Sequence, residues 1–365
     1  MENIDWSALG FDYHKTDVNV RYYFTDGKWS DMEVTSDEYI KMHMSASCLH
    51  YGIELFEGLK AFRGVDGKVR LFRVEDNARR LRSSAERLCL PLPTVEMVVN
   101  ACVEVVRRNE AYIPPYGTGA SLYLRPVMFG TTAGLGVKPA KDALLIVYCS
   151  PVGAYFKEGI KPILVAIDRE QDRAAPRGTG DVKVGGNYAA SLLSGEKGHK
   201  MGYSNIMYLD AAEHKYIEEC GACNFFGIKD GKYITPKSPS VLPSITNMSL
   251  RQLARDMGLE VEAERKARGS LSVEEYKEVR DQMIGEIEQE KEAIVAEVEP
   301  LRELKTGIDE IDTTGTKLPF GVVAIKKKDL EAVKEQAKAY TANRDEIGEL
   351  RERSAAVSRR EQRAD

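Results

Sequence analysis

The sequence lacks any apolar run of the roughly 18 residues that a membrane span requires, and its start shows no basic segment followed by an apolar one. It also has little net charge: 52 basic and 57 acidic residues give a formal charge of −5, without the basic excess typical of nucleic-acid-binding proteins. Apolar residues make up 43% and charged residues 30%, the balance of an ordinary globular chain. We therefore expect a cytoplasmic protein with no membrane or nucleic-acid partner.

Cysteine and histidine are scarce. Six cysteines in 365 residues stand mostly in apolar surroundings, as reduced thiols do. Only Cys220 and Cys223 form a C-x-x-C pair, and the five histidines are scattered. A zinc ion would lack a ligand set, so we expect no metal, and a redox or metal role for the pair is the less favoured alternative.

The length predicts two domains. Hydrophobic patterning predicts a small α/β domain over residues 1–168, with helices over 75–88 and 95–108 and strands over 71–74, 121–129, 143–149 and 161–168. Residues 169–181 are charged, contain Pro and Gly, and have no apolar period, which is typical of a linker. The fold class is therefore α/β, more narrowly α+β.

A larger domain is expected over residues 182–325. Its predicted elements are strands over 206–209, 224–228 and 233–235, a hairpin turn at Asp230-Gly231, and a helix through Leu250 and Met257 that ends at Gly258. Residues 271–300 then hold ten acidic and three basic side chains, and 326–365 form a charged helical tail.

The stretch from Asp181 to Ser191 is the most informative, because a lysine stands before paired glycines where two domains should meet. A lysine at its reference pKa near 10.4 is only about one part in a thousand neutral at pH 7, so Lys183 would need burial or a cationic neighbour to react. A turn at the glycines could bring Tyr188 back toward it. The alternative interpretation is a surface lysine before a glycine turn.

Four further features suit an anionic, ring-shaped ligand. The segment from Leu242 to Asn247 precedes a predicted helix and offers free amides, which can bind phosphate or simply cap the helix. Glu218 and Glu219 precede a strand, where a buried carboxylate could keep a pyridine nitrogen protonated, or the two could simply lie in a solvated turn. Arg80 could reach a phosphate, or form a surface salt bridge. Tyr123 and Arg125 share a strand face and would suit a carboxylate substrate.

Five segments together resemble branched-chain-amino-acid aminotransferases, and their order also matches. They are His50–Phe62 (HYGIELFEGLKAF), Leu122–Pro126 (LYLRP), Lys183–Ser191 (KVGGNYAAS), Tyr216–Glu219 (YIEE) and Leu242–Thr246 (LPSIT). The resemblance runs from about residue 5 to about residue 266. It implies the fold-type IV architecture, a small α/β domain and a larger barrel-like domain with pyridoxal 5′-phosphate between them, and it implies a homodimer.

The resemblance also implies residue roles. Lys183 would carry the cofactor as a Schiff base and move the proton at the substrate's Cα. The other cofactor contacts would be Tyr188 at the phenolic oxygen, Glu219 at the ring nitrogen, and Arg80, Ile245 and Thr246 at the phosphate. Tyr51, Phe56, Tyr123 and Arg125 would surround the substrate, which Tyr13 could also reach. The implied reaction transfers the amino group of leucine, isoleucine or valine to 2-oxoglutarate.

The chain departs from the family after residue 266. Family members carry a Gly-Thr-Ala segment there, whereas this chain has an acidic stretch and only a late echo at Thr314-Gly315-Thr316. Two alternatives therefore stand beside the branched-chain reaction. One is another fold-type IV enzyme, such as a D-amino acid aminotransferase or an aminodeoxychorismate lyase, and the other is a non-catalytic cofactor-binding scaffold.

Overall fold

The computed structural model describes residues 4–154 and 161–264, together with a few positions between 285 and 324. The chain divides into two compact units, Met1–Ile160 with Val165–Val273 and Lys161–Leu164 with Glu274–Asp365. In the second unit the structure describes the antiparallel strands β15 (Thr316–Lys317) and β16 (Val323–Ala324). The predicted acidic stretch and charged tail therefore lie almost wholly outside the described residues, as do Thr314 and Gly315.

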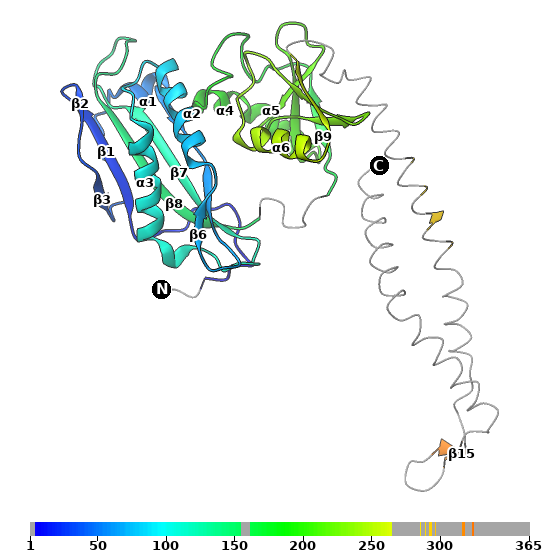
Figure 1. Ribbon diagram of the computed structural model, residues 1–365. Coiled ribbons are helices and arrows are strands. Elements are labelled where there is room, and N and C mark those ends of the chain that lie inside the picture. Colours follow the sequence, from blue (N-terminus) through cyan, green and yellow to red (C-terminus); the bar gives the residue numbers. More distant parts are fainter. Residues whose placement is uncertain are drawn as a thin grey trace. The chain divides into compact units, whose positions relative to one another are not determined.

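The first unit begins with an eight-stranded antiparallel sheet in the order β2-β1-β8-β7-β5-β6, with β3 beside β1 and β4 beside β7. Figure 1 shows two helices along one face of this sheet. The longest strands, β7 and β8, pair from Ser121 with Val152 to Gly130 with Ala143. The strands are β1 (Asn19–Thr25), β2 (Lys28–Trp29), β3 (Glu33–Thr35), β4 (Glu54–Phe56), β5 (Leu59–Arg63), β6 (Val69–Leu71), β7 (Ser121–Gly130) and β8 (Ala143–Val152).

Helices α2 (Val74–Arg87) and α3 (Val95–Arg108) cover the sheet because each has an apolar stripe. On α2 the stripe includes the buried Leu81, and on α3 the buried Val98 and Val105. The predicted helix over 95–108 is confirmed. The predicted strand over 71–74 is wrong in its position, because Arg73 adopts a left-handed conformation (φ 54°) that ends β6 and starts α2. The short helices α1 (Ser47–Tyr51) and η1 (Glu110–Tyr112) lie in the connections.

The rest of this unit contains two three-stranded sheets, β11-β10-β9 and β12-β13-β14. Each has one parallel pair, β9 with β10 and β13 with β14, and a parallel pair needs a crossover connection. Helices α4 and α5 provide the first crossover and α6 the second. The elements are β9 (Val165–Asp168), α4 (Gly185–Ala190), α5 (Leu192–Lys200), β10 (Asn205–Leu209), β11 (Ile217–Cys220), β12 (Gly227–Lys229), β13 (Lys232–Pro236), α6 (Ile245–Asp256) and β14 (Glu260–Glu264).

Local turn chemistry follows the sequence closely here. Asp230 and Gly231 both have positive φ (51° and 73°), as a two-residue hairpin turn requires, so the predicted turn is confirmed. Gly258 also has positive φ (83°), two residues after α6 ends. The predicted strand over 224–228 begins only at Gly227, because Asn224 instead forms an isolated bridge with Glu219.

Residues 169–181 form turns and bends, yet Arg173 and Gly180 within this segment are buried.

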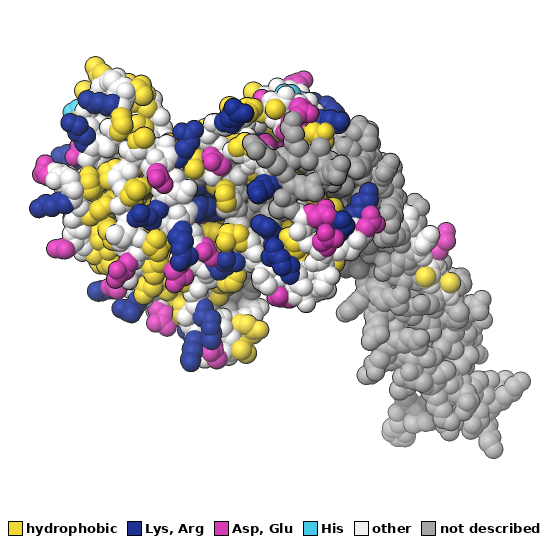
Figure 2. Space-filling model, turned by 45° about the horizontal axis from the view of Figure 1, so that its top comes forward, with side chains coloured by type: hydrophobic (Ala, Val, Ile, Leu, Met, Phe, Trp, Pro, Cys, Tyr) yellow, Lys and Arg dark blue, Asp and Glu magenta, His cyan; other side chains and the backbone are white. Residues whose placement is uncertain are grey.

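Over the described part of the face in Figure 2, basic and acidic side chains are intermingled. Among the described residues no helix is long and apolar enough to span a bilayer.

Candidate active site

One cavity of about 410 Å³ gathers most of the residues that the sequence singled out. One side comes from the eight-stranded sheet and α2, the other from Lys183, β11 and the start of α6. Six predicted site residues line it: Arg80, Tyr123, Lys183, Glu219, Ile245 and Thr246. Segments far apart in the chain, from Gly58 to Thr246, thus meet in one cavity of the first unit.

The backbone of Lys183 is fixed on both sides. Its amide donates a hydrogen bond to Ser84 Oγ of α2 (3.0 Å), and its carbonyl accepts one from the Phe56 amide of β4 (3.1 Å). The neighbouring Val182 and Val184 are buried in the same core as α2 and α3. Because both valines point into the core, the alternating backbone directs the Lys183 side chain the other way, into the cavity.

The Lys183 amine is desolvated. Nζ lies 2.6 Å from the Tyr188 hydroxyl and 4.6 Å from the centre of the Phe56 ring. Burial, and then the positive charge of Arg80, lower the pKa of Lys183 to about 8. A substantial fraction of the amine is therefore neutral near physiological pH, which a nucleophile or a base requires.

Tyr188 faces Lys183 because the chain turns sharply into α4. The first residue of that helix, Gly185, lies close to Glu54, whose carboxylate would have to move if a Cβ were added there. Burial raises the pKa of Tyr188 to about 12, so its phenol keeps its proton at neutral pH. It can therefore donate a hydrogen bond to an oxygen on a ligand beside Lys183.

Glu219 is buried and ion-paired with Arg173, a residue that the sequence reasoning missed. Oε2 lies 3.1 Å from Arg173 Nη2 and 3.2 Å from the Leu242 amide, while Oε1 accepts from Asn224 Nδ2 (3.3 Å). Burial raises the pKa of Glu219 to about 7, and Arg173 opposes the rise. Patterning could not find Arg173, because nothing in the turn segment 169–181 signals that it is buried.

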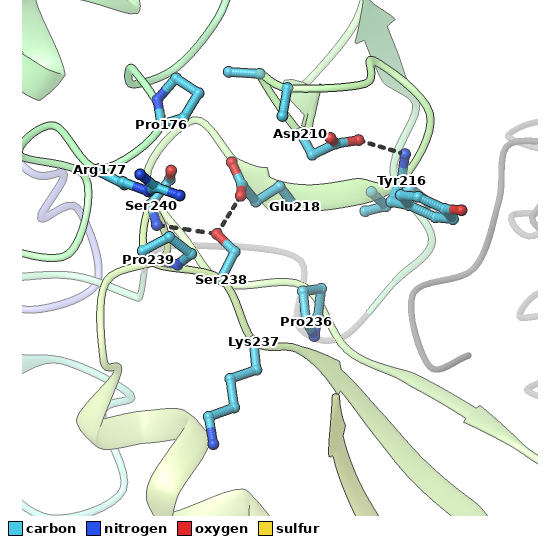
Figure 3. A pocket seen from close by; sticks show the side chains of 13 residues that line it. Pro176, Arg177, Asp210, Tyr216, Glu218, Pro236, Lys237, Ser238, Pro239 and Ser240 are labelled. Atoms are coloured by element: carbon cyan, nitrogen blue, oxygen red, sulfur yellow. Dashed lines mark hydrogen bonds between the residues drawn. The ribbon is translucent and has the colours of Figure 1, made fainter. Parts of the chain in front are cut away.

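Glu218 and Glu219 are neighbours on β11, so their side chains point to opposite faces of the strand. Glu219 lines the cavity with Lys183, whereas Glu218 lines a second cavity of about 490 Å³. Figure 3 shows Glu218 there, accepting a hydrogen bond from Ser238, near Asp210. Strand alternation therefore selects Glu219 as the carboxylate that faces Lys183.

Arg80 is held by a carboxylate that the sequence reasoning also missed. Glu57, with no exposed surface, receives Arg80 Nε at 2.7 Å and Nη2 at 2.8 Å, and Asn77 Nδ2 at 2.7 Å. Arg80 Nη1 donates to the Pro243 carbonyl (3.0 Å), just before α6. Since a guanidinium has five N–H groups, Arg80 keeps donors for a ligand.

Helix α6 leaves two backbone amides without partners inside the helix. Its cap residue Ser244 accepts from the Asn247 amide through Oγ (3.0 Å) and from the Met248 amide through its carbonyl (3.0 Å). The amides of Ile245 and Thr246 therefore have no intrahelical acceptor, and both residues line the cavity. A helix N-terminus beside Arg80 suits a phosphate group.

Pyridoxal 5′-phosphate fits these donors and acceptors. Its phosphate matches Arg80 and the α6 amides, its aldehyde matches the Lys183 amine, and its ring nitrogen matches the Glu219 carboxylate.

Cys220 and Cys223 are free thiols, and the described residues contain no cluster of three or more metal-binding side chains.

Of the residues predicted to surround the substrate, Phe56, Tyr123 and Arg125 lie together near Tyr188, whereas Tyr51 and Tyr13 lie elsewhere. Arg125 donates to the Tyr123 hydroxyl (3.1 Å) and lies 4.6 Å from the centre of the Phe56 ring, which in turn is 4.9 Å from the Tyr188 ring. Tyr51 does not line the cavity; it is 39% exposed, and its hydroxyl donates to the Leu135 carbonyl. Tyr13 lies at a different cavity and donates to Glu38 Oε1.

Comparisons with known proteins identify the family of the chain. The family model "Amino-transferase class IV" matches residues 54–278. A branched-chain-amino-acid aminotransferase of Haemophilus influenzae is 49% identical over 267 residues, which is 71% of this chain and 78% of that protein. One of Helicobacter pylori is 50% identical over 258 residues, 70% of this chain and 76% of that protein. The chain therefore belongs to the class IV aminotransferases.

Solved structures give the same result. The branched-chain amino acid aminotransferase of Escherichia coli matches with a TM-score of 0.58 and 31% identity, covering 70% of this chain and 80% of that one. The T.th. branched-chain amino acid aminotransferase with pyridoxamine 5′-phosphate matches with a TM-score of 0.58 and 28% identity, covering 69% and 79%. The resemblance to branched-chain aminotransferases, the fold-type IV architecture, the transaminase class and the pyridoxal phosphate cofactor are thus confirmed.

Proposed function

We infer that this aminotransferase moves the amino group of leucine, isoleucine or valine to 2-oxoglutarate, with Lys183 as the residue that carries the cofactor. The observation that supports this most is the position of the Lys183 amine, which lies in the cavity 2.6 Å from the Tyr188 hydroxyl. When bound, the cofactor stabilises the negative charge that develops at the substrate's Cα. All other tasks fall to the protein's side chains.

Lys183 would take the proton from the substrate's Cα and deliver it to C4′ of the cofactor, because an amine with a pKa of about 8 can both accept and donate a proton near neutral pH. Tyr188 donates to the cofactor's phenolic oxygen. Glu219 accepts from the ring N–H, and the Arg173 guanidinium favours its ionised form. Arg80 and the amides of Ile245 and Thr246 hold the phosphate.

The substrate lies against Phe56, Tyr123 and Arg125, and Tyr51 is proposed as a further contact. The Phe56 ring offers an apolar surface to a branched side chain, and Arg125 offers a charge to the distal carboxylate of glutamate. Since one methylene changes binding by only about 1–3 kcal/mol, leucine, isoleucine and valine should all react.

The test is a half-reaction followed by absorbance. Leucine added to the protein loaded with pyridoxal phosphate should convert its aldehyde form to the amine form, and 2-oxoglutarate should reverse the change. A response to D-alanine alone would favour a D-amino acid aminotransferase, and release of pyruvate from aminodeoxychorismate would favour the lyase. No change with any of these, despite bound cofactor, would favour a non-catalytic scaffold.

We further propose that the chain has domains over residues 1–168 and 182–325, a linker over 169–181 and a tail over 326–365. We also propose that the protein is a homodimer and lies in the cytoplasm. All six cysteines are free, which suits a reducing compartment. Large apolar side chains such as Tyr39, Met44 and Leu135 are more than 80% exposed, which suits a contact surface. Sedimentation equilibrium should give twice the chain mass; a monomer at micromolar concentration would contradict the dimer.

A further inference from the structure

The active-site cavity carries an excess of positive charge. Both buried carboxylates near it already have a guanidinium partner, Glu57 with Arg80 and Glu219 with Arg173. Two ammonium groups, those of Lys60 and Lys183, also line the cavity. A cavity with this balance favours an anionic ligand.

Lys60 has no role in the assignment above. Its neighbours on β5, Leu59 and Ala61, are buried in the core, so Lys60 points from the opposite face of the sheet, into the cavity. On that face it is paired in register with Tyr123 of β7, whose hydroxyl bonds to Arg125. Phe62, two residues further along β5, lines the cavity as well.

The Lys60 ammonium is half-buried, and the described part of the chain provides it with no hydrogen-bond or ion-pair partner. Burial is the cause that lowers its pKa, with no neighbouring carboxylate to oppose it. Partial burial of a charge is costly unless an opposite charge compensates for it. An anion bound in the cavity would supply that compensation.

We propose that Lys60 binds an oxyanion group of the ligand, as a third cationic contact beside Arg80 and Arg125. The proposal rests on the proposed function, which brings two kinds of oxyanion into the cavity: the phosphate of the cofactor and the carboxylates of the substrate. Both present the same chemistry to an ammonium, and the experiment separates them.

The experiment compares Lys60→Met and Lys60→Arg with Lys68→Met, which removes an exposed lysine from the β5–β6 turn. Equilibrium dissociation constants are measured by absorbance for four ligands. Pyridoxal phosphate and pyridoxal are bound to the apoprotein, and glutarate and 4-methylpentanoate to the loaded protein. Circular dichroism verifies that each variant is folded.

Lys60→Met should weaken at least one anionic ligand roughly tenfold to a hundredfold, the usual effect of a hydrogen bond to a charged group, and Lys60→Arg should restore most of the loss. A loss for pyridoxal phosphate but not pyridoxal identifies the phosphate. A loss for glutarate alone identifies the distal carboxylate, and a loss for both acids identifies the carboxylate that they share.

The proposal is overturned if Lys60→Met binds all four ligands within twofold of Lys68→Met. If Lys60→Met does not fold, Lys60→Gln takes its place with the same criterion. These equilibria need no turnover, so a wild-type protein that binds the ligands but does not convert leucine refutes the aminotransfer reaction alone. A wild-type protein that binds none of the four refutes both.

Discussion

The reactive lysine and the carboxylate opposite it are each tuned by an arginine. Arg80 helps to lower the pKa of Lys183, and Arg173 opposes the effect of burial on Glu219. Without Arg173 the pKa of Glu219 would rise further, and a protonated carboxyl cannot keep a pyridine nitrogen charged. The chemistry of the site therefore depends on residues that do not themselves react.

The pKa of Lys183 predicts how attachment of the cofactor depends on pH. Only the neutral amine has the lone pair that attacks an aldehyde, and burial lowers the pKa of Lys183 from 10.5 to about 8. The rate at which the apoprotein binds pyridoxal phosphate should rise with pH, with a midpoint near 8, and level off above it. Stopped-flow absorbance measures this rate; a midpoint near that of an ordinary lysine would contradict the assigned environment.

Replacing Arg173 should destabilise the protein. Arg173→Met removes the partner of the buried Glu219, and the carboxyl can respond by taking up a proton, so the free energy of unfolding should fall by about 1–3 kcal/mol rather than by the full cost of an unpaired buried charge. The exposed Arg169→Met should change it by less than about 0.5 kcal/mol. Urea unfolding of the two apoproteins makes the comparison, and equal stabilities would show that the ion pair is not formed.

At the scale of elements, α3 and α6 have the same kind of N-terminal cap, but only the cap of α6 lies at the active-site cavity. Thr94 caps α3 by accepting from the Met97 amide, and Ser244 caps α6 by accepting from the Asn247 amide, both at 3.0 Å. The α3 cap is not part of the cavity lining, whereas the α6 cap is. The two helices therefore separate the stabilising effect of a cap from its effect on ligand binding.

Ser244→Ala and Thr94→Ala should each lower the free energy of unfolding by about 1 kcal/mol. Only Ser244→Ala should also weaken pyridoxal phosphate, since loss of the cap loosens the turn that presents the Ile245 and Thr246 amides. Unfolding and cofactor titration of both variants provide the test. Equal cofactor affinity in the two variants would contradict the assignment of the α6 amides to the phosphate site.

The sequence predicted those elements whose signals are local. The α3 helix and the hairpin turn at Asp230-Gly231 follow from apolar spacing and turn chemistry within a few residues. The burial of Arg173 depends on its ion pair with Glu219, which lies on another element far along the chain, so no local pattern contains it. The later start of β12 depends on the bridge between Asn224 and Glu219, which apolar spacing does not reveal. Glu57 was missed for the same reason, because its partner Arg80 is 23 residues away on another element.

At the scale of the whole molecule, the site requires two parts of the chain to be held together. Arg80 bonds to the Pro243 carbonyl, Arg73 to Ser249 Oγ, and the Lys183 amide to Ser84 Oγ. The cofactor would add contacts to both sides of the same cavity. Its binding should therefore stabilise the folded chain rather than a single loop.

Bound cofactor should raise the free energy of unfolding by about 2.7 kcal/mol when pyridoxal phosphate is at a hundred times its dissociation constant. Lys183→Ala should lose most of this gain at the same concentration, because the covalent attachment is absent. Urea unfolding with and without cofactor measures both proteins. Equal stabilisation of the two would show that the cofactor binds elsewhere.

The most direct test concerns the attachment of the cofactor to Lys183. The protein loaded with pyridoxal phosphate is reduced with borohydride, digested and mapped by mass spectrometry. The account predicts a single pyridoxyl group, on the peptide that contains Lys183. A pyridoxyl group on Lys60 or any other lysine, with Lys183 unmodified, would contradict it.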